Sequence, residues 1–328
     1  MKYKISKLNC SKTFAVPAPL RLTIATRGSN LALRQAALVK EAFEARHGAQ
    51  IRVELLVVKT KGDVILNVPL AKVGGKGLFV KEVEEAVLDG RADLAVHSLK
   101  DVPMDLAPGL ALGVIMERAD PADMFLSHAY PNLAALPPGA VAGTSSLRRQ
   151  AQVLALRPDV RVNFLRGNVE TRLRKLEEKR YDAIIMAAAG LNRLGISAPH
   201  AVRLNEHDFL PAVGQGALGI EFHEDRQDLR DLLSFLEHPP TRLCVEAERG
   251  LLAGLDGNCQ TPLAGYAVLQ EPETIRIEGL AASCDGREII RQSLTGPAHA
   301  PRELGLRLAR DMKRAGADRL MGSGQSNN

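Results

Sequence analysis

One short pattern occurs twice in this chain. It occupies residues 26–36, directly after the apolar run 22–25, and residues 144–151, directly after the small apolar run 140–143. Each copy predicts a strand, a tight turn rich in Thr, Ser and Gly, and a helix that begins at a Ser N-cap. The free N–H groups and positive dipole end of such a helix bind anions, and a neighbouring arginine adds donors that match carboxylate or phosphate. Two copies indicate a polyanionic ligand held between two similar domains.

The composition favours a basic pocket over a basic surface. The chain has 328 residues, 45% hydrophobic and 25% charged, a length that suits two or three domains. Aromatic residues make up only 4% and Trp is absent, so we expect no stacking surface for single-stranded nucleic acid. The formal net charge is +5, and several arginines fall in one third of the chain: Arg148, Arg149, Arg166, Arg172, Arg174 and Arg193. We expect them to face one ligand, with a solvated helix face as the alternative for any single one.

The cysteine pattern indicates neither a disulfide framework nor a metal site. The four cysteines are Cys10, Cys244, Cys259 and Cys284. None forms a Cys-x-x-Cys pair or a zinc spacing, so we expect no metal and a cytoplasmic location. No window has the apolar length of a membrane span. Residues 1–20 are basic but lack the apolar core of a secretory signal, so we expect a disordered extension, with an organelle transit peptide as the alternative.

Strands and helices alternate through most of the chain, which is typical of α/β proteins. We expect a strand over residues 51–58, covered on both faces of its sheet, and a helix over 78–88. The strand predicted at 93–98 ends beside Lys100 and Asp101. Because ligands of open α/β sheets gather at the carboxyl ends of strands, we expect chemistry at these two residues.

A glycine-rich stretch lies between the strand expected at 51–58 and the helix expected at 78–88. Residues 72–77 contain Lys72 and Lys76 but lack the ending of a Walker A loop. Two interpretations stay open: a mobile cover over an anionic site, or an ordinary surface loop.

A second lobe repeats the alternation. Strands predicted at 160–165 and 183–187 lead to Arg166 and Arg193, and the chain then crosses back through residues 211–216. We therefore expect two doubly wound α/β lobes around a cleft, plus a small α+β third domain. The predicted division is an extension at 1–20, domain 1 at 21–117 and 214–237, domain 2 at 118–213, domain 3 at 238–321 and a frayed tail at 322–328.

The third domain has a different pattern. Its expected elements are a helix at 242–252, strands at 265–269, 274–282 and 288–294, and one amphipathic helix at 301–320. Asp285-Gly286 predicts a hairpin turn between the last two strands.

Two residues are candidates for chemistry. Cys259 lies in a polar turn between Gly257 and Pro262; a lone cysteine is most often a buried small hydrophobe, but these surroundings suit a nucleophile or an attachment point. Asp101 either caps a turn or, among so many arginines, stabilises a developing cation or transfers a proton. His97 alternates with apolar residues and is interpreted as a core histidine rather than a base.

Several motifs together resemble the porphobilinogen deaminase (hydroxymethylbilane synthase) family. The resemblance runs from about residue 21 to about residue 320 and rests on residues 74–79 (GGKGLF), 97–103 (HSLKDVP), 143–150 (GTSSLRRQ), 165–168 (LRGN), 211–216 (PAVGQG) and 258–260 (NCQ). The chain departs from the common family pattern at Asn30, Leu99, Thr261 and Ala264, and these changes put no expected role in doubt.

The resemblance implies a transferase that joins four porphobilinogen molecules head to tail, releases four ammonia and yields linear hydroxymethylbilane for tetrapyrrole (haem) biosynthesis. It also implies a dipyrromethane cofactor, made from substrate and attached to Cys259 by a thioether, with Asp101 as the catalytic carboxylate. The implied protein is a monomer that needs no metal or nucleotide, binds neither nucleic acid nor membrane, and passes its product to the next tetrapyrrole enzyme.

The family motifs also imply which residues line the site. Those expected to bind the cofactor are Cys259, Lys100, Asp101, Thr144, Ser146, Arg148, Arg149, Arg166 and Gly167. Those expected to bind substrate are Arg27, Ser29, Arg172, Arg193, Gln215, Lys72 and Lys76. Since Arg148 and Arg149 are adjacent on a helix and point about 100° apart, we expect them to contact different groups.

Two other classes of protein remain as alternatives. The lobes resemble the domains of periplasmic binding proteins, which would explain the anion turns but neither Asp101 nor the domain that contains Cys259. A nucleic-acid-binding protein is disfavoured by the scarce aromatic residues and the clustered charge. An intact mass that shows two pyrrole units on Cys259 would exclude both.

Overall fold

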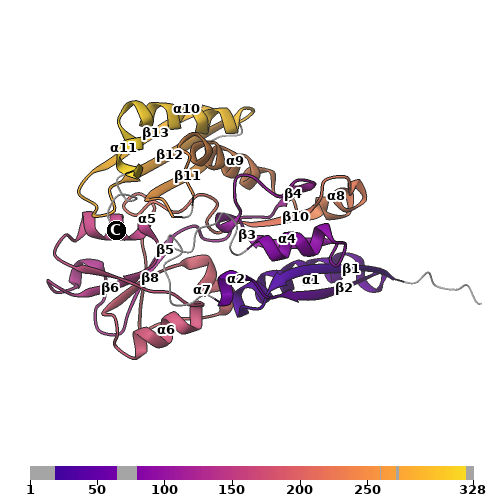
Figure 1. Cartoon of the computed structure of the whole chain (residues 1–328), viewed down its shortest axis with the longest axis horizontal. Coiled ribbons are helices and arrows are strands. Elements are labelled where there is room, and N and C mark those ends of the chain that lie inside the picture. Colours follow the sequence, from indigo (N-terminus) through magenta and orange to yellow (C-terminus); the bar gives the residue numbers. More distant parts are fainter. Residues whose placement is uncertain (1–18, 65–79, 259, 271–272, 323–328) are drawn as a thin grey trace, which may run out of the picture.

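The computed structural model describes residues 19–64, 80–258, 260–270 and 273–322. Two five-stranded sheets, each flanked by helices, lie side by side, and a three-stranded sheet with its own helices covers them at one end (Figure 1). This arrangement confirms the predicted fold class of two α/β lobes plus a smaller α+β part. The domain boundaries stay a prediction.

The first sheet has the strand order β2-β1-β3-β10-β4. Its elements are β1 (Leu20–Arg27), α1 (Asn30–His47), β2 (Ile51–Val58), α2 (Lys61–Val64), α4 (Lys81–Leu88), β3 (Leu94–Ser98), β4 (Leu110–Ile115), β10 (Leu218–His223) and α8 (Gln227–Leu233). Strand β10 runs antiparallel to β3 and β4, whereas β1, β2 and β3 are parallel. Buried Ile24, Phe43 and Phe222 belong to its main core.

The second sheet repeats this plan in the order β7-β6-β8-β5-β9. Its elements are β5 (Asp123–Ser127), β6 (Val141–Thr144), α5 (Leu147–Leu156), β7 (Arg161–Phe164), α6 (Val169–Glu177), β8 (Ala183–Ala187), α7 (Ala188–Leu194) and β9 (His200–Arg203). The strand before each Ser-capped helix, β1 or β6, is second in its sheet, and the antiparallel strand, β10 or β5, is fourth. The duplicated sequence pattern thus marks two lobes of the same topology.

The third sheet is antiparallel and joins β11, β12 and β13. Its elements are α9 (Pro239–Gly254), β11 (Leu263–Gln270), β12 (Thr274–Ala282), β13 (Ile289–Pro297), α10 (Pro301–Arg314) and α11 (Ala317–Gly322). Leu251, Ile277 and Leu308 lie in the core between the sheet and its helices. Short 3-10 turns complete the chain: η1 (Gly48–Gln50), η2 (Leu99–Asp101), η3 (Leu133–Ala135) and η4 (Ser234–Leu236).

The structure corrects two local predictions. Strand β2 is not covered on both faces, because it is an edge strand in which exposed Arg52 and Glu54 alternate with buried residues. The single helix expected at 301–320 is two helices, because Gly316 between them has a positive φ of 98°. The hairpin predicted at Asp285-Gly286 is confirmed, with a hydrogen bond of 2.9 Å from the Gly286 N–H to the Ser283 carbonyl.

The two chain crossings between the lobes are held by one buried carboxylate. Glu248 of α9 is fully buried and accepts hydrogen bonds of 2.8 and 2.9 Å from the Arg118 guanidinium on the first crossing. It also accepts a bond of 2.7 Å from the Gly214 N–H on the returning crossing. At Gly216 the crossings touch so closely that a Cβ would lie 2.5 Å from the Ala119 carbonyl oxygen. The third sheet is thus tied to both lobes where they join.

Candidate active site

Both predicted anion turns are present as Ser-capped helix starts. The Ser29 hydroxyl accepts a bond of 3.3 Å from the Ala32 N–H at the start of α1, and Ser146 accepts one of 3.4 Å from the Arg149 N–H at the start of α5. Thr144, at the end of β6, supports the second turn by accepting a bond from the Ser146 N–H. The two turns have the same local construction.

The start of α1 lies against the second lobe. Helix α1 packs on α7, where Leu31 approaches Gly190. Next to it, the Asn30 side chain donates a hydrogen bond of 2.9 Å to Glu170 of α6. The first anion turn is therefore placed at the junction of the two lobes.

The paired arginines of the second turn converge on one acid. Arg149 donates two hydrogen bonds to the Asp123 carboxylate, at 3.0 and 2.7 Å, and Arg148 forms an ion pair of 2.7 Å with its other oxygen. All three side chains are buried. The two side chains share this buried carboxylate, but Arg148 also donates to the Leu210 carbonyl at 2.7 Å and Arg149 to the Ile185 carbonyl at 3.1 Å. That they contact different groups of a ligand stays a prediction.

Gln215 extends this network to the predicted catalytic turn. Its side-chain amide donates to the Asp123 carboxylate at 3.0 Å and to the Pro121 carbonyl at 2.7 Å, and its oxygen accepts a bond of 3.3 Å from Lys100. Gln215 is buried, and it comes from the returning crossing that includes Gly214 and Gly216. Residues of both lobes and of the crossing thus share one polar cluster.

This cluster carries more positive charge than its acids balance. Burial, together with the neighbouring Arg149, lowers the pKa of Lys100 to about 8 against the opposing effect of Asp101. Burial and Arg149 likewise lower the pKa of Arg172 to about 10. Burial raises the pKa of Asp123, but Arg148 and Arg149 overcome this effect and hold it well below its usual range. A bound polyanion would relieve the repulsion among these cations.

The remaining predicted arginines reach the same junction and bind backbone carbonyls. Arg166 of the second lobe donates a hydrogen bond of 3.2 Å to the Gly62 carbonyl of the first lobe, so this bond links the two lobes. Arg172 donates to Gly167 at 2.8 Å, and Arg193 donates to Gly216 at 2.7 Å. Gly167 has a positive φ of 122°, and a Cβ there would lie 2.6 Å from the Thr171 side chain. Arg174 instead lies exposed beside Glu178, so the solvated-face alternative holds for that residue.

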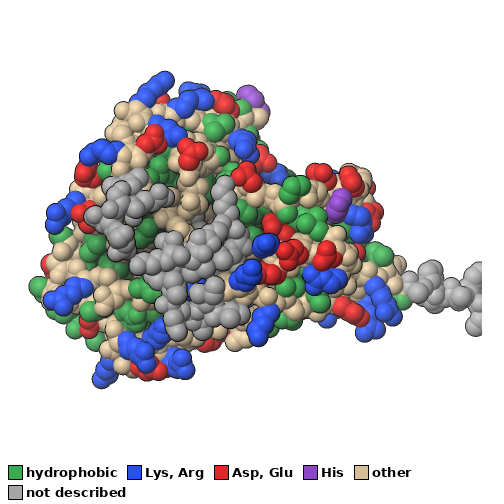
Figure 2. Space-filling view, viewed as in Figure 1, with side chains coloured by type: hydrophobic (Ala, Val, Ile, Leu, Met, Phe, Trp, Pro, Cys, Tyr) green, Lys and Arg blue, Asp and Glu red, His purple; other side chains and the backbone are tan. Residues whose placement is uncertain are grey.

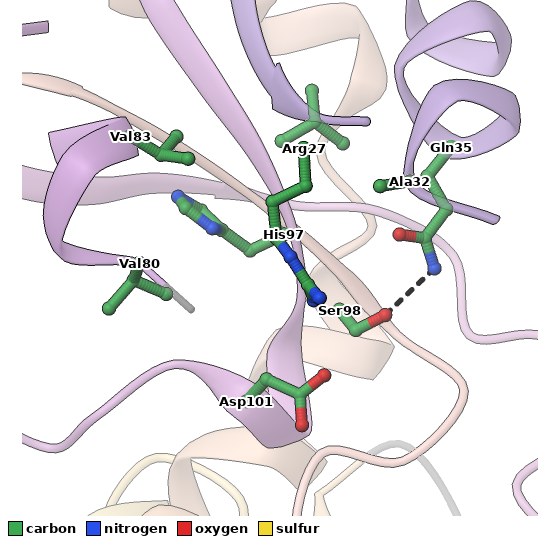
Figure 3. A pocket seen from close by; sticks show the side chains of 9 residues that line it. Arg27, Ala32, Gln35, Val80, Val83, His97, Ser98 and Asp101 are labelled. Carbon is green, nitrogen blue, oxygen red and sulfur yellow. Dashed lines mark hydrogen bonds between the residues drawn. The ribbon is translucent and has the colours of Figure 1, made fainter. Parts of the chain in front are cut away.

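Asp101 is exposed and lines a small cavity of about 30 Å³. The polar groups around this cavity come from Arg27, Gln35, His97 and Ser98, and Gln35 donates a bond of 2.7 Å to the Ser98 hydroxyl. In Figure 3 the Arg27 side chain extends from the end of β1 toward Ser98 and Asp101. The space accommodates water-sized groups. An exposed carboxylate and an arginine therefore share one opening.

His97 is a core residue, as predicted. Its ring is buried and lies 2.9 Å from a carboxylate oxygen of the buried Glu221. The polar groups that face the junction come instead from Ser98, at the end of β3, and from Lys100 and Asp101 in the turn η2.

The basic residues of the site differ from those of the surface. On the face shown in Figure 2, Lys and Arg side chains are interspersed with Asp and Glu and form no continuous basic surface. Within the described ranges, no helix is long and apolar enough to cross a bilayer, and no group of three or more His, Cys, Asp or Glu side chains suits a metal ion.

Three predicted site residues, Cys259, Lys72 and Lys76, lie outside the described residues. The residues beside Cys259 form a turn in which Asn258 accepts a bond of 2.8 Å from the Gln260 N–H. Sequence reasoning missed Asp123 and Gln35. The signal for Asp123 was available, since an acid at the start of the apolar strand Met124–Leu126 must find a partner when the strand is buried.

The fold and the site define an α/β protein that places an exposed carboxylate beside a cluster of cations between two like lobes. Two family models match the chain: "Porphobilinogen deaminase, dipyromethane cofactor binding domain" over residues 22–231, and "Porphobilinogen deaminase, C-terminal domain" over residues 242–314. The chain belongs to the porphobilinogen deaminase family, which polymerises porphobilinogen into hydroxymethylbilane for tetrapyrrole synthesis.

Individual relatives agree over nearly the whole chain. The porphobilinogen deaminase of Nitratidesulfovibrio vulgaris (strain DP4) is 61% identical over 300 residues, which are 92% of this chain and 95% of that protein. The one from Lawsonia intracellularis is 55% identical over 303 residues, 92% and 98% of the two chains. Solved structures with some likeness include the methionine binding protein MetQ (12% identity, TM-score 0.42, 66% of this chain and 88% of that one). Another is the periplasmic sulphonate binding protein SsuA from Escherichia coli (12%, TM-score 0.40, 73% and 71%).

Asp123→Asn tests the two-arginine cluster. Removing this charge leaves Arg148 and Arg149 buried without a counterion, so we expect the free energy of unfolding to fall by about 3 kcal/mol. Because the pKa of Asp123 is held low, the ionised carboxylate stabilises the folded chain above its unfolded pKa, and this contribution is lost only in strong acid. Urea denaturation at neutral pH measures the change. As the control, Asp228→Asn removes a surface partner of Arg226 and should cost about 0–1 kcal/mol; equal losses would contradict the assignment.

Lys100 should titrate in an unusual range when no cofactor is bound. Its pKa of about 8 makes it an ammonium below pH 8 and a neutral amine above, so its attraction for anions declines through that pH. NMR of dimethylated lysines in cofactor-free protein should show a resonance with a midpoint near pH 8 that is missing from Lys100→Arg. If the resonance assigned to Lys100 titrates instead near pH 10.4, the usual value for lysine, the burial of Lys100 beside other cations is contradicted.

Proposed function

We propose that the cation cluster binds the carboxylate arms of a growing pyrrole chain while Asp101 acts as the catalytic carboxylate. The observation that carries this proposal is the exposure of Asp101 beside Lys100 and Arg172, two cations whose pKa values are lowered by burial and by the neighbouring Arg149. Each porphobilinogen carries an acetate and a propionate arm, so a chain of several units is a polyanion. Such a ligand supplies the negative charge that the cluster lacks.

The donor set fits a dipyrromethane cofactor, and the matched family model is a cofactor-binding domain of that kind. The residues that would hold the cofactor are Lys100, Asp101, Thr144, Ser146, Arg148, Arg149, Arg166 and Gly167. When bound, it supplies the pyrrole carbon to which the first substrate is joined. Planar guanidinium groups suit its carboxylates, and the helix start at Ser146 adds N–H donors.

Covalent attachment to Cys259 is part of the proposal. The described cysteines are poor candidates for a thioether, because burial raises the pKa of the Cys244 thiol to about 11 and also raises that of Cys284. A thiolate is the reactive form, so a buried thiol of high pKa is inert. In the sequence, Cys259 follows α9 and stands between the polar residues Asn258 and Gln260, and polar neighbours suit a reactive thiol.

Asp101 would act on charge that develops during the reaction. When ammonia leaves porphobilinogen, the C–N bond breaks with its electron pair on nitrogen, and positive charge spreads onto the pyrrole. A carboxylate that accepts the pyrrole N–H stabilises that charge, and an arginine cannot. The amine leaves as ammonia after gaining one proton, the ring carbon that attacks forms the new C–C bond, and that carbon then loses its own proton, so each condensation releases one NH3 overall.

The other expected residues would orient substrate. Arg27, Ser29, Arg172, Arg193 and Gln215 surround the same junction, so they can fix the acid arms while the rings face Asp101. Lys72 and Lys76 are proposed from the family resemblance. We further propose a cytoplasmic monomer that hands its product to the next enzyme of tetrapyrrole synthesis and contacts neither membrane nor nucleic acid.

Asp101→Asn tests the catalytic role. The amide keeps the shape and loses the charge, so substrate binding should survive while turnover falls by about 10²–10³-fold. Single-turnover kinetics with porphobilinogen, together with the intact mass of the enzyme–substrate species, separates binding from chemistry. Turnover within about threefold of the parent protein would reduce Asp101 to a turn residue.

Cys259→Ser tests the attachment. The purified parent protein should carry the mass of two pyrrole units, and the variant should lack it, because a hydroxyl is a much weaker nucleophile than a thiolate. Cys284→Ser is the matched control and should keep the adduct. An adduct of unchanged mass on Cys259→Ser would refute attachment at this residue.

A further inference from the structure

A side chain of helix α9 is hydrogen-bonded to the backbone next to Asp101. The Arg249 guanidinium donates hydrogen bonds to three successive carbonyls, those of Val102 at 3.3 Å, Pro103 at 2.8 Å and Met104 at 3.4 Å. Arg249 is half-buried, and burial lowers its pKa, as does the nearby Arg302. The three residues that follow Asp101 are thus tied to a helix of the third sheet.

The same face of α9 makes a second contact with this turn. Val245 lies four residues before Arg249, which places it one turn away on the same side of the helix. It is fully buried and packs in one cluster with Leu99 and Val102, the residues at either end of Lys100-Asp101. Arg249 holds the turn by polar contacts, and Val245 holds it by packing.

The turn has little support of its own. The 3-10 turn η2 is three residues long and is closed by a bond of 3.2 Å from the Val102 N–H to the Leu99 carbonyl. Asp101 itself is exposed. A planar fork that binds several carbonyls fixes both the position and the direction of the peptide groups, which a flexible ammonium cannot do. In the sequence, Cys259 follows shortly after the end of α9 at Gly254.

We propose that Arg249 is a positioning residue that holds the Asp101 turn in its reactive place and thereby sets the turnover rate. This inference rests on the proposed function of Asp101. Arg249 does not touch the reacting atoms; it acts through the backbone of residues 102–104.

The test compares Arg249→Gln with Arg242→Gln in fully loaded enzyme, with cofactor content checked by intact mass. Arg242 is a matched control on the same helix, half-buried and bonded to the Gly113 carbonyl at 2.9 Å and to Glu237. In Arg249→Gln, we expect kcat to fall by about 10–100-fold with KM changed less than about twofold. Hydrogen exchange of peptides covering residues 99–104 should become faster in this variant and stay unchanged in Arg242→Gln.

A conservative variant keeps the test open if Arg249→Gln folds poorly. Arg249→Lys retains the charge and the stem but reaches fewer carbonyls, so its turnover and exchange should fall between those of the parent and Arg249→Gln. The inference is overturned by unchanged exchange at residues 99–104 in both Arg249 variants, or by an equal increase in Arg242→Gln. Faster exchange with full turnover overturns it too. Asp101→Asn is measured alongside the Arg249 variants. If Asp101→Asn keeps full turnover, the proposed function of Asp101 fails; if Asp101→Asn loses turnover but the Arg249 variants do not, only the inference about Arg249 fails.

Discussion

The site depends on the ion pairs that the buried Asp123 carboxylate forms with Arg148 and Arg149. It lies at the start of β5, directly after the chain enters the second lobe, and binds Arg148, Arg149 and Gln215. Those partners come from helix α5 and from the returning crossing, so one buried charge joins segments far apart in sequence. Gln215 also accepts a hydrogen bond from Lys100, which belongs to the first lobe. A buried charge this well paired fixes geometry, because each partner would be left without compensation if it moved.

The same arrangement is the reason why we propose an anionic ligand for the site. One carboxylate serves two guanidinium groups, so the second positive charge is only partly balanced. Burial lowers the pKa values of Lys100 and Arg172, and the nearby Arg149 lowers them further. Acidic arms of a pyrrole chain can complete the balance without removing Asp123. The charge is inside the junction, where solvent screens it least, and this agrees with the interspersed charges on the face shown in Figure 2.

Much of this could be predicted from local sequence rules, and the remainder could not for a physical reason. The Ser N-caps at Ser29 and Ser146 and the position of Asp101 after β3 follow from short-range chemistry and from the ends of parallel strands. The convergence of Arg148 and Arg149 on Asp123 does not, because helix periodicity sets the direction of Cβ and not of a long flexible side chain. The edge position of β2 likewise depends on strand order, which the residues 51–58 alone do not specify.

Asp123 and Glu248, both fully buried, link segments of the three sheets. Glu248 binds the Arg118 guanidinium and the Gly214 N–H at the crossings, while Asp123 orders the cations beside them. Both carboxylates are committed to donors of the protein, whereas Asp101 is exposed and directed to the cavity. A ligand that enters the junction therefore meets ordered cations for its acidic arms and an accessible carboxylate for its ring N–H groups. In the proposed function, that separation of roles would let a strongly basic site stabilise a developing positive charge.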